Sequence, residues 1–115
     1  LQLKAMQRTP PAAGQVEIRV QATGLNFRDV LNALDLYPGD PGPLGGECAG
    51  TVVAAGEGVT HLQAGDKVMA IAAGSFADYV TTHADLAVKK PQNISFAQAA
   101  TIPITFLTAY YALYR

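Results

Sequence analysis

Glycine and proline are spread along the whole chain, and this spacing constrains the fold more than any other feature. The 115 residues include 11 glycines and seven prolines, which divide the sequence into short runs of apolar or alternating residues. Such runs have the length of strands and are too short for long helices. The runs predicted as strands are residues 15–23, 47–55, 67–72, 76–82 and 86–89. The pattern therefore predicts a mainly β protein with short helices, arranged as a small antiparallel barrel.

The first of these runs has the clearest alternation of apolar and polar residues. Successive side chains of a strand point to opposite faces of the sheet, so the two sets face different environments. We expect one set to face the core and the other to face water; these are Val16, Ile18, Val20 and Ala22 for the core, and Glu17, Arg19 and Gln21 for the solvent.

Three segments carry helix signals. Asn26 can cap a helix that ends near Leu36, because apolar residues follow it at helical spacing. The segment 37–43 cannot continue that helix, since it holds three prolines and two glycines. Ser95 and Gln98 form a capping-box pattern for a short helical turn. A further helix is predicted to start at Thr105, after a proline, and to be still running at the last residue.

Charge and cysteine content exclude several classes of function. Lys and Arg number 8 against 9 Asp and Glu, and no basic stripe is present, so the sequence does not favour nucleic acid or an anionic membrane as partner. No apolar run approaches the length of a membrane span, and we expect a cytoplasmic protein. Cys48 is the single cysteine; it excludes an internal disulfide and is expected to be a small core hydrophobe. His61 and His83 lack neighbours at metal-ligand spacing and are expected at the surface.

Polar residues at predicted strand and helix ends form the candidate site. Asn26 and Arg28 stand where a strand gives way to a helix, although a helix cap and a surface arginine explain them as well. Glu47 lies between glycines and an apolar strand, so it is either exposed or paired with Arg28 or a backbone cluster. Thr108 is predicted in the first turn of the last helix, where free backbone donors can hold a polar group, although a plain core helix with an aromatic face explains the segment as well. Tyr37, beside the Pro/Gly turn, either packs there or offers a phenol to a ligand.

These segments, taken together, resemble the N-terminal half of the medium-chain dehydrogenase/reductases. The resemblance rests on residues 24–50, 64–68, 74–80 and 108–113, and covers nearly the whole chain. The order Asn26-Phe-Arg-Asp-Val-Leu, Tyr37-Pro-Gly and Gly45-Gly-Glu-Cys-Ala-Gly is most similar to enoyl reductase domains of modular polyketide synthases and multidomain fatty acid synthases. Gly46 stands where zinc-dependent members carry a histidine, so the resemblance is to the zinc-free branch and no metal site is expected.

The resemblance implies a fold and a division of the chain. Residues 1–104 would form a GroES-like, partly open β-barrel that binds substrate, and residues 105–115 would begin a helix leading into a Rossmann domain. That Rossmann domain is not part of this chain, which has no Gly-x-Gly-x-x-Gly phosphate loop. In the family, NADPH binds between the two domains.

The resemblance also implies an activity and roles for single residues. The activity would be NADPH-dependent reduction of an α,β-unsaturated acyl thioester carried on the phosphopantetheine arm of an acyl carrier protein, among other synthase domains. Asn26, Phe27 and Arg28 would line the nicotinamide side of the cleft, and Thr108 would approach the nicotinamide amide. Tyr37 would act at the α-carbon as the catalytic residue. Two alternatives remain open, namely a free-standing zinc-free quinone or enone reductase and a non-enzymatic, co-chaperonin-like barrel.

Overall fold

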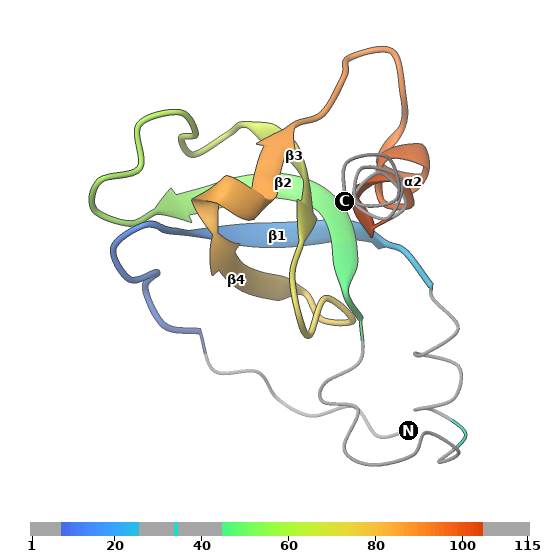
Figure 1. The fold of residues 1–115 in the computed structure, drawn as a ribbon, viewed down its shortest axis with the longest axis horizontal. Coiled ribbons are helices and arrows are strands. Elements are labelled where there is room, and N and C mark those ends of the chain that lie inside the picture. The colour runs from blue at the N-terminus through green and yellow to red at the C-terminus, as the bar shows by residue number, and fades with distance from the viewer. Residues whose placement is uncertain (1–7, 26–33, 35–44, 105–115) are drawn as a thin grey trace, which may run out of the picture.

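The structure, a computed structural model, describes residues 8–25, 34 and 45–104 and contains one antiparallel sheet (Figure 1). The strands are β1 (Gln15–Thr23), β2 (Glu47–Ala55), β3 (Lys67–Ile71), β4 (Tyr79–His83) and β5 (Ala87–Lys89). They form a five-stranded sheet in the order β4-β1-β2-β3-β5, and every pairing is antiparallel. The predicted mainly β fold is therefore confirmed.

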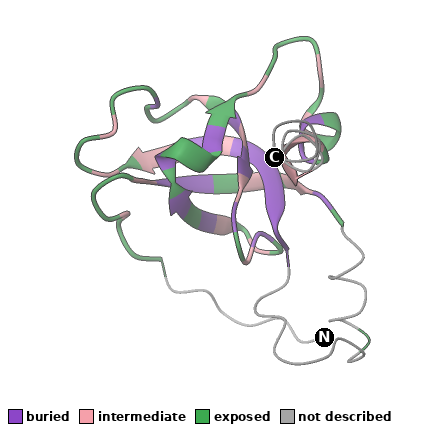
Figure 2. Ribbon diagram, in the orientation of Figure 1, coloured by how far each residue is buried: buried purple, intermediate pink, exposed green. Residues whose placement is uncertain are grey.

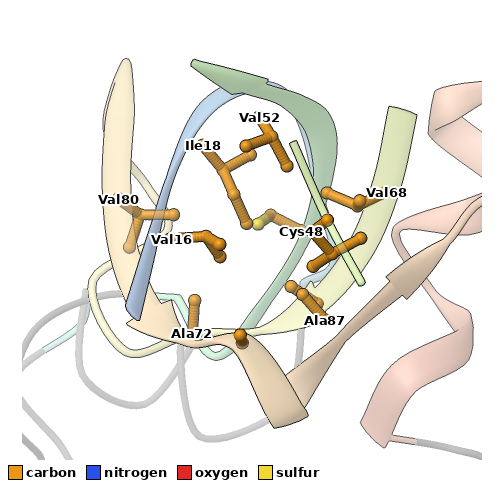
Figure 3. Close-up of a cluster of buried hydrophobic side chains, with 11 residues drawn as sticks. Val16, Ile18, Cys48, Val52, Val68, Ala72, Val80 and Ala87 are labelled. Carbon is orange, nitrogen blue, oxygen red and sulfur yellow. The ribbon is translucent and has the colours of Figure 1, made fainter. Parts of the chain in front are cut away.

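The sheet curls into a barrel because its two edge strands are consecutive in the chain. β4 and β5 lie at opposite edges of the sheet, yet only the 3-10 turn η1 (Ala84–Leu86) separates them in sequence. So short a connection brings the two edges together around the core, as the ring of strands in Figure 3 shows. β4 and β5 do not pair with each other, so the barrel is partly open.

The interior of this barrel holds the main hydrophobic core. All five strands contribute small or β-branched side chains, which fit the concave face of a tightly curved sheet (Figures 2 and 3). The buried members are Val16, Ile18, Cys48, Val52, Leu62, Val68, Ala70, Ala72, Val80, Ala84 and Ala87. A second, smaller cluster joins β2 to the short helix α2 (Phe96–Ala99) and consists of Ala49, Ala99 and Ala100.

Two irregularities in the β1–β2 pairing increase the curvature of the sheet. Register shifts occur between Glu17 and Ile18 and between Val20 and Ala22. Bulges of this kind bend a strand and increase its twist. At the second shift Gly50 faces β1 so closely that a Cβ there would lie 2.1 Å from the Arg19 carbonyl oxygen. The bend of the barrel therefore depends on a residue without a side chain at position 50.

Glu17 differs from the prediction, since it is buried instead of facing water. It lies on the face of β1 opposite to that of Val16 and Ile18, as the alternation predicts. Arg8, however, covers this position: Nε and Nη2 donate to the two Glu17 carboxylate oxygens at 3.1 and 3.0 Å. The Arg8 guanidinium also lies 3.8 Å from the centroid of the Tyr79 ring. Arg8, nine residues before Glu17 in the chain, thus shields a polar residue that the alternation assigns to solvent.

Several predicted boundaries are confirmed and others are shifted. The Ser95–Gln98 capping box is present and starts α2. β4 begins at Tyr79 instead of residue 76, because residues 74–78 turn: Gly74 has φ +80°, and the Asp78 carbonyl accepts from the Val20 amide. Residues 102–104 are helical, ahead of the start predicted at Thr105, and the rest of that predicted helix lies outside the described residues. The helix predicted from Asn26 to Leu36 lies almost wholly outside the described residues.

Candidate active site

The end of β1 and the start of β2 meet at one end of the barrel. Thr23 and Cys48 are partners in the antiparallel register. Beyond this pair, the Gly24 amide donates to the Glu47 carbonyl oxygen at 3.1 Å. The chain after Leu25 and the chain before Gly45 therefore join the sheet at the same end, and the predicted residues 26–28 and 37 belong to these two stretches.

The C-terminal end of α2 lies at this same place. A Cβ built on Gly24 would lie 2.7 Å from the Ala100 carbonyl oxygen, and 2.6 Å from Cγ of Glu47. Such distances leave no room for a side chain, so Gly24 lets the backbone of α2 approach β1 directly. In Figure 1, α2 stands beside the end of β1 from which the chain continues. A third stretch, which leads through residues 101–104 toward Thr108, thus leaves from the same end of the barrel.

The loop between β3 and β4 completes this arrangement. Ser75 is fully buried, and its hydroxyl donates to the Glu47 carbonyl oxygen at 3.0 Å. Gly45 has φ +93°, and a Cβ there would lie 2.5 Å from Ser75 Oγ. The Gly45 carbonyl also accepts from the Gly74 amide at 3.1 Å. We call the group Gly24, Gly45, Glu47, Ser75 and Ala100 the Glu47 junction.

Glu47 itself is among the most buried side chains of the described residues, with 2% of its surface exposed. The sequence left two possibilities for this carboxylate, an exposed position or a paired one. Burial excludes the exposed position. A carboxylate at this depth needs compensating donors or a cation, and the Arg28 named as a candidate lies outside the described residues.

Cys48, the neighbour of Glu47, points to the other face of β2 and into the main core. Its side chain is fully buried (Figure 3), as predicted for a small core hydrophobe. Burial, with a smaller contribution from the negative charge of Glu47, raises the pKa of the Cys48 thiol to about 12. A thiol with that pKa stays protonated at neutral pH, so Cys48 is not a nucleophile.

The five residues predicted to form the site, Asn26, Phe27, Arg28, Tyr37 and Thr108, all lie outside the described residues. The structure does place the flanking residues of their three stretches, which are Leu25, Gly45 and Ile104. Gly45 is part of the Glu47 junction, Leu25 follows its member Gly24, and residues 101–104 follow its member Ala100. The sequence predicted these stretches separately, and the fold gathers their attachment points at one end of the barrel.

Both histidines lie at the surface, as expected. His61 forms a hydrogen bond between Nε2 and the Ala84 carbonyl oxygen at 3.1 Å, which ties its loop to η1. His83 is exposed at the end of β4. Within residues 8–25, 34 and 45–104, no three His, Cys, Asp or Glu side chains are grouped so that they could hold a metal ion. The same part of the chain contains no helix with the length and apolar character of a membrane span.

Sequence reasoning missed the convergence on Glu47. Ser75 and Ala100 carry no chemical signal of their own, and they lie far from Glu47 in the chain. A usable signal was present in the glycines, since Gly24, Gly45 and Gly74 each stand just outside a predicted strand. A glycine beside a strand allows another part of the backbone to approach closely, as it does at Gly24 and Gly45.

Fold and site together define the class: a partly open GroES-like barrel in which the end of β1, the start of β2 and the end of α2 meet beside a buried glutamate. The chain belongs to the family of alcohol dehydrogenase GroES-like domains, which it matches over residues 12–92. It is 52% identical over 104 residues to the pikromycin polyketide synthase component PikAII of Streptomyces venezuelae, and the match covers 90% of this chain.

Solved structures show the same fold. The CurK enoyl reductase superposes with a TM-score of 0.85 at 43% identity over 94% of this chain. The quinone oxidoreductase of Escherichia coli, complexed with NADPH, superposes with a TM-score of 0.82 at 36% identity over 97% of this chain. The resemblance to medium-chain dehydrogenase/reductases and to synthase enoyl reductases is therefore confirmed.

The chain covers only a part of the length of these proteins. It spans 3% of the pikromycin synthase component and 36% of each of the two solved structures. The described residues also do not fit the phosphates of a dinucleotide. A phosphate site needs a glycine-rich turn at the start of a helix that follows a strand, whereas α2, with four residues, follows the turn 91–95.

Proposed function

We propose that this chain is the substrate-binding barrel of an enoyl reductase in a modular polyketide synthase. The observation that supports this proposal most is the Glu47 junction. Three stretches of chain begin there, at one end of the barrel, and each was predicted to contain site residues. The similarity to the pikromycin synthase component and to the CurK enoyl reductase supports the assignment to this enzyme class.

The proposed reaction saturates the double bond of an α,β-unsaturated acyl thioester. A hydride equivalent adds to the β-carbon, the negative charge moves onto the thioester as an enolate, and a proton then adds to the α-carbon. NADPH would be the reductant, held largely by a part of the enzyme beyond these residues. The substrate would be delivered on the phosphopantetheine arm of an acyl carrier protein, in the cytoplasm, within a set of synthase domains.

Roles for the site residues are part of the proposal. Asn26, Phe27 and Arg28 would contact the nicotinamide side of the cleft, and Thr108 would approach the nicotinamide amide. Activation of the thioester carbonyl would come from hydrogen-bond donors, because zinc is not expected at Gly46. Tyr37 would supply a proton or a hydrogen bond to the enolate, since a phenol stays protonated at neutral pH.

A second candidate is a free-standing quinone or enone reductase, which the likeness to the NADPH-bound quinone oxidoreductase favours. The co-chaperonin-like alternative finds no support among the synthases and reductases to which the chain is similar.

A comparison of kcat/KM for two substrates of the intact enzyme tests the proposal. We expect NADPH oxidation with an enoyl thioester of pantetheine, and kcat/KM for it to exceed that for a simple quinone by at least about 10²-fold. Turnover of the quinone at the higher kcat/KM would support the second candidate, and turnover of neither would refute the proposal.

A further inference from the structure

The loop between β3 and β4, residues 72–78, is fixed to the neighbouring strands at both of its ends. Hydrogen bonds from its first residues reach the start of β2, beside which the loop lies in Figure 1. The donors are the amides of Ala72 and Gly74 and the hydroxyl of Ser75, and the acceptors are the carbonyl oxygens of Gly46, Gly45 and Glu47, at 3.0, 3.1 and 3.0 Å respectively. At its other end the Asp78 carbonyl accepts from the Val20 amide at 2.8 Å. The loop therefore has a fixed place at the end of the barrel that holds the Glu47 junction.

Phe76 lies in the middle of this loop and is exposed, although its backbone is closely packed. Its backbone nitrogen would lie 2.7 Å from a Cβ placed on Gly45. The residue nevertheless keeps 41% of its surface exposed, whereas the preceding Ser75 is fully buried. An apolar surface left in water contributes nothing to folding, but on a fixed backbone it can bind an apolar ligand with little further loss of conformational freedom.

A second exposed apolar residue leaves the Glu47 junction at the end of β1. Leu25, which is 66% exposed, follows Gly24, whose amide donates to the Glu47 carbonyl oxygen. The same oxygen atom accepts from the hydroxyl of Ser75, the residue directly before Phe76. Leu25 and Phe76 therefore each follow a residue that is hydrogen-bonded to this one atom. The junction thus presents apolar surface from two elements that are distant in sequence.

The amount of this apolar surface fits a small ligand better than a protein partner. An aromatic side chain presents about 200 Å² in all, so the exposed parts of Phe76 and Leu25 together amount to roughly 200 Å². A stable protein interface buries about 800 Å² on each partner. The substrate of the proposed reaction has an apolar part of suitable size, which is the acyl chain beyond its double bond.

We propose that Phe76 is a substrate-contact residue that binds the acyl chain of the enoyl thioester and thereby selects for chain length. This inference rests on the proposed enoyl reductase function. Phe76 carries no group that can move a proton or stabilise an enolate, so it takes no part in the chemical step. An apolar contact of this kind is equal in the bound substrate and in the transition state, so it lowers KM and leaves kcat unchanged.

The test compares two chain lengths in the intact reductase, using the pantetheine thioesters of trans-2-octenoic and trans-2-butenoic acid. We expect Phe76→Ala to lower kcat/KM about 10-fold for the octenoyl substrate, through KM, and less than about twofold for the butenoyl substrate. Phe76→Leu, which keeps an apolar side chain, is expected to retain most of the preference for the longer chain. The matched control is Val88→Ala on the edge strand β5, because Val88 is also exposed, at 52%, and β3 separates β5 from β2 in the sheet. This control is expected to leave both values within about twofold of the wild type.

The ratio of the two kcat/KM values decides the inference. An unchanged octenoyl-to-butenoyl ratio in Phe76→Ala, or the same change of ratio in Val88→Ala, would overturn it. A lower melting temperature of Phe76→Ala with an unchanged ratio would show that another part of the enzyme covers Phe76, and would also overturn it.

A separate binding measurement distinguishes this inference from the proposed function. An intact wild-type enzyme that reduces neither thioester would refute the proposed function. Calorimetric titration with the saturated octanoyl and butanoyl pantetheine thioesters needs no turnover. Tighter binding of the octanoyl compound in the wild type, lost in Phe76→Ala, would still support an acyl-chain contact at Phe76, and equal binding of the two compounds would overturn it.

Discussion

Removal of the Cys48 thiol should change how the stability of this domain depends on alkaline pH. Cys48 is fully buried in the main core, and its pKa is raised to about 12, chiefly by burial and further by the charge of Glu47. In the unfolded chain a cysteine titrates near its ordinary value of about 8.5. The folded state therefore keeps the thiol proton over a range of pH in which the unfolded state loses it.

The sign and size of the effect follow from this difference. Below about pH 8 both states hold the proton, so the contribution of the neutral thiol is fully present and independent of pH. Above that pH only the unfolded state ionises, and the free energy of unfolding falls by about 1.4 kcal/mol per pH unit until the folded pKa is reached. At about pH 10 the loss is therefore about 2 kcal/mol, a large part of the stability of a domain this small.

Urea unfolding of the intact enzyme at about pH 7.5 and about pH 10 measures this loss, with Cys48→Ala as the matched control. All other titratable groups are common to the two proteins, so the difference between them isolates Cys48. We also expect the native thiol to resist an aromatic disulfide reagent at about pH 8 and to react fully in denaturant. The same pH dependence in wild type and Cys48→Ala, or rapid labelling of the folded protein, would refute the argument.

Four further predictions concern the fold and the proposed site. Gly50→Ala should destabilise the domain by about 3 kcal/mol, because its Cβ would meet the Arg19 carbonyl oxygen, whereas Gly58→Ala, at φ +84° in open space, should cost only about 1 kcal/mol; equal thermal shifts would contradict the close approach at Gly50. In a fluorescence titration the isolated 115-residue chain should show no binding of NADPH at micromolar concentration, since its described residues offer no phosphate site. Elemental analysis of the enzyme prepared without chelator should find no stoichiometric zinc, and zinc bound through Glu47 or Cys48 would overturn the zinc-free assignment. Tyr37→Phe in the intact reductase should still oxidise NADPH with an α-methyl enoyl thioester but lose control of the α-centre, with a rate loss of at most about 10²-fold; unchanged product configuration and rate would leave Tyr37 a packing residue.

The strands and the short capped helix could be predicted from the sequence because their causes are local. Alternation at positions 15–23 follows from the pleat of a single strand, and the capping box at Ser95 needs only Gln98, three residues further on. Cys48 was predicted in the core because an apolar strand surrounds it and no cation lies near it in sequence. The zinc-free class was implied by the resemblance, because Gly46 stands where zinc-dependent members carry a histidine, and it stays a prediction.

The environment of the polar residues was decided only by the tertiary structure. Glu17 lies on the face of β1 that the alternation assigns to solvent. It is nevertheless buried, because Arg8, which precedes the first strand, binds its carboxylate and covers it. The Glu47 junction joins residues from β1, β2, the β3–β4 loop and α2, which no local spacing relates. Local pattern determines which way a side chain points from its strand. What meets it there depends on how the ends of distant strands are brought together, and in this protein that arrangement determines where the candidate site is built.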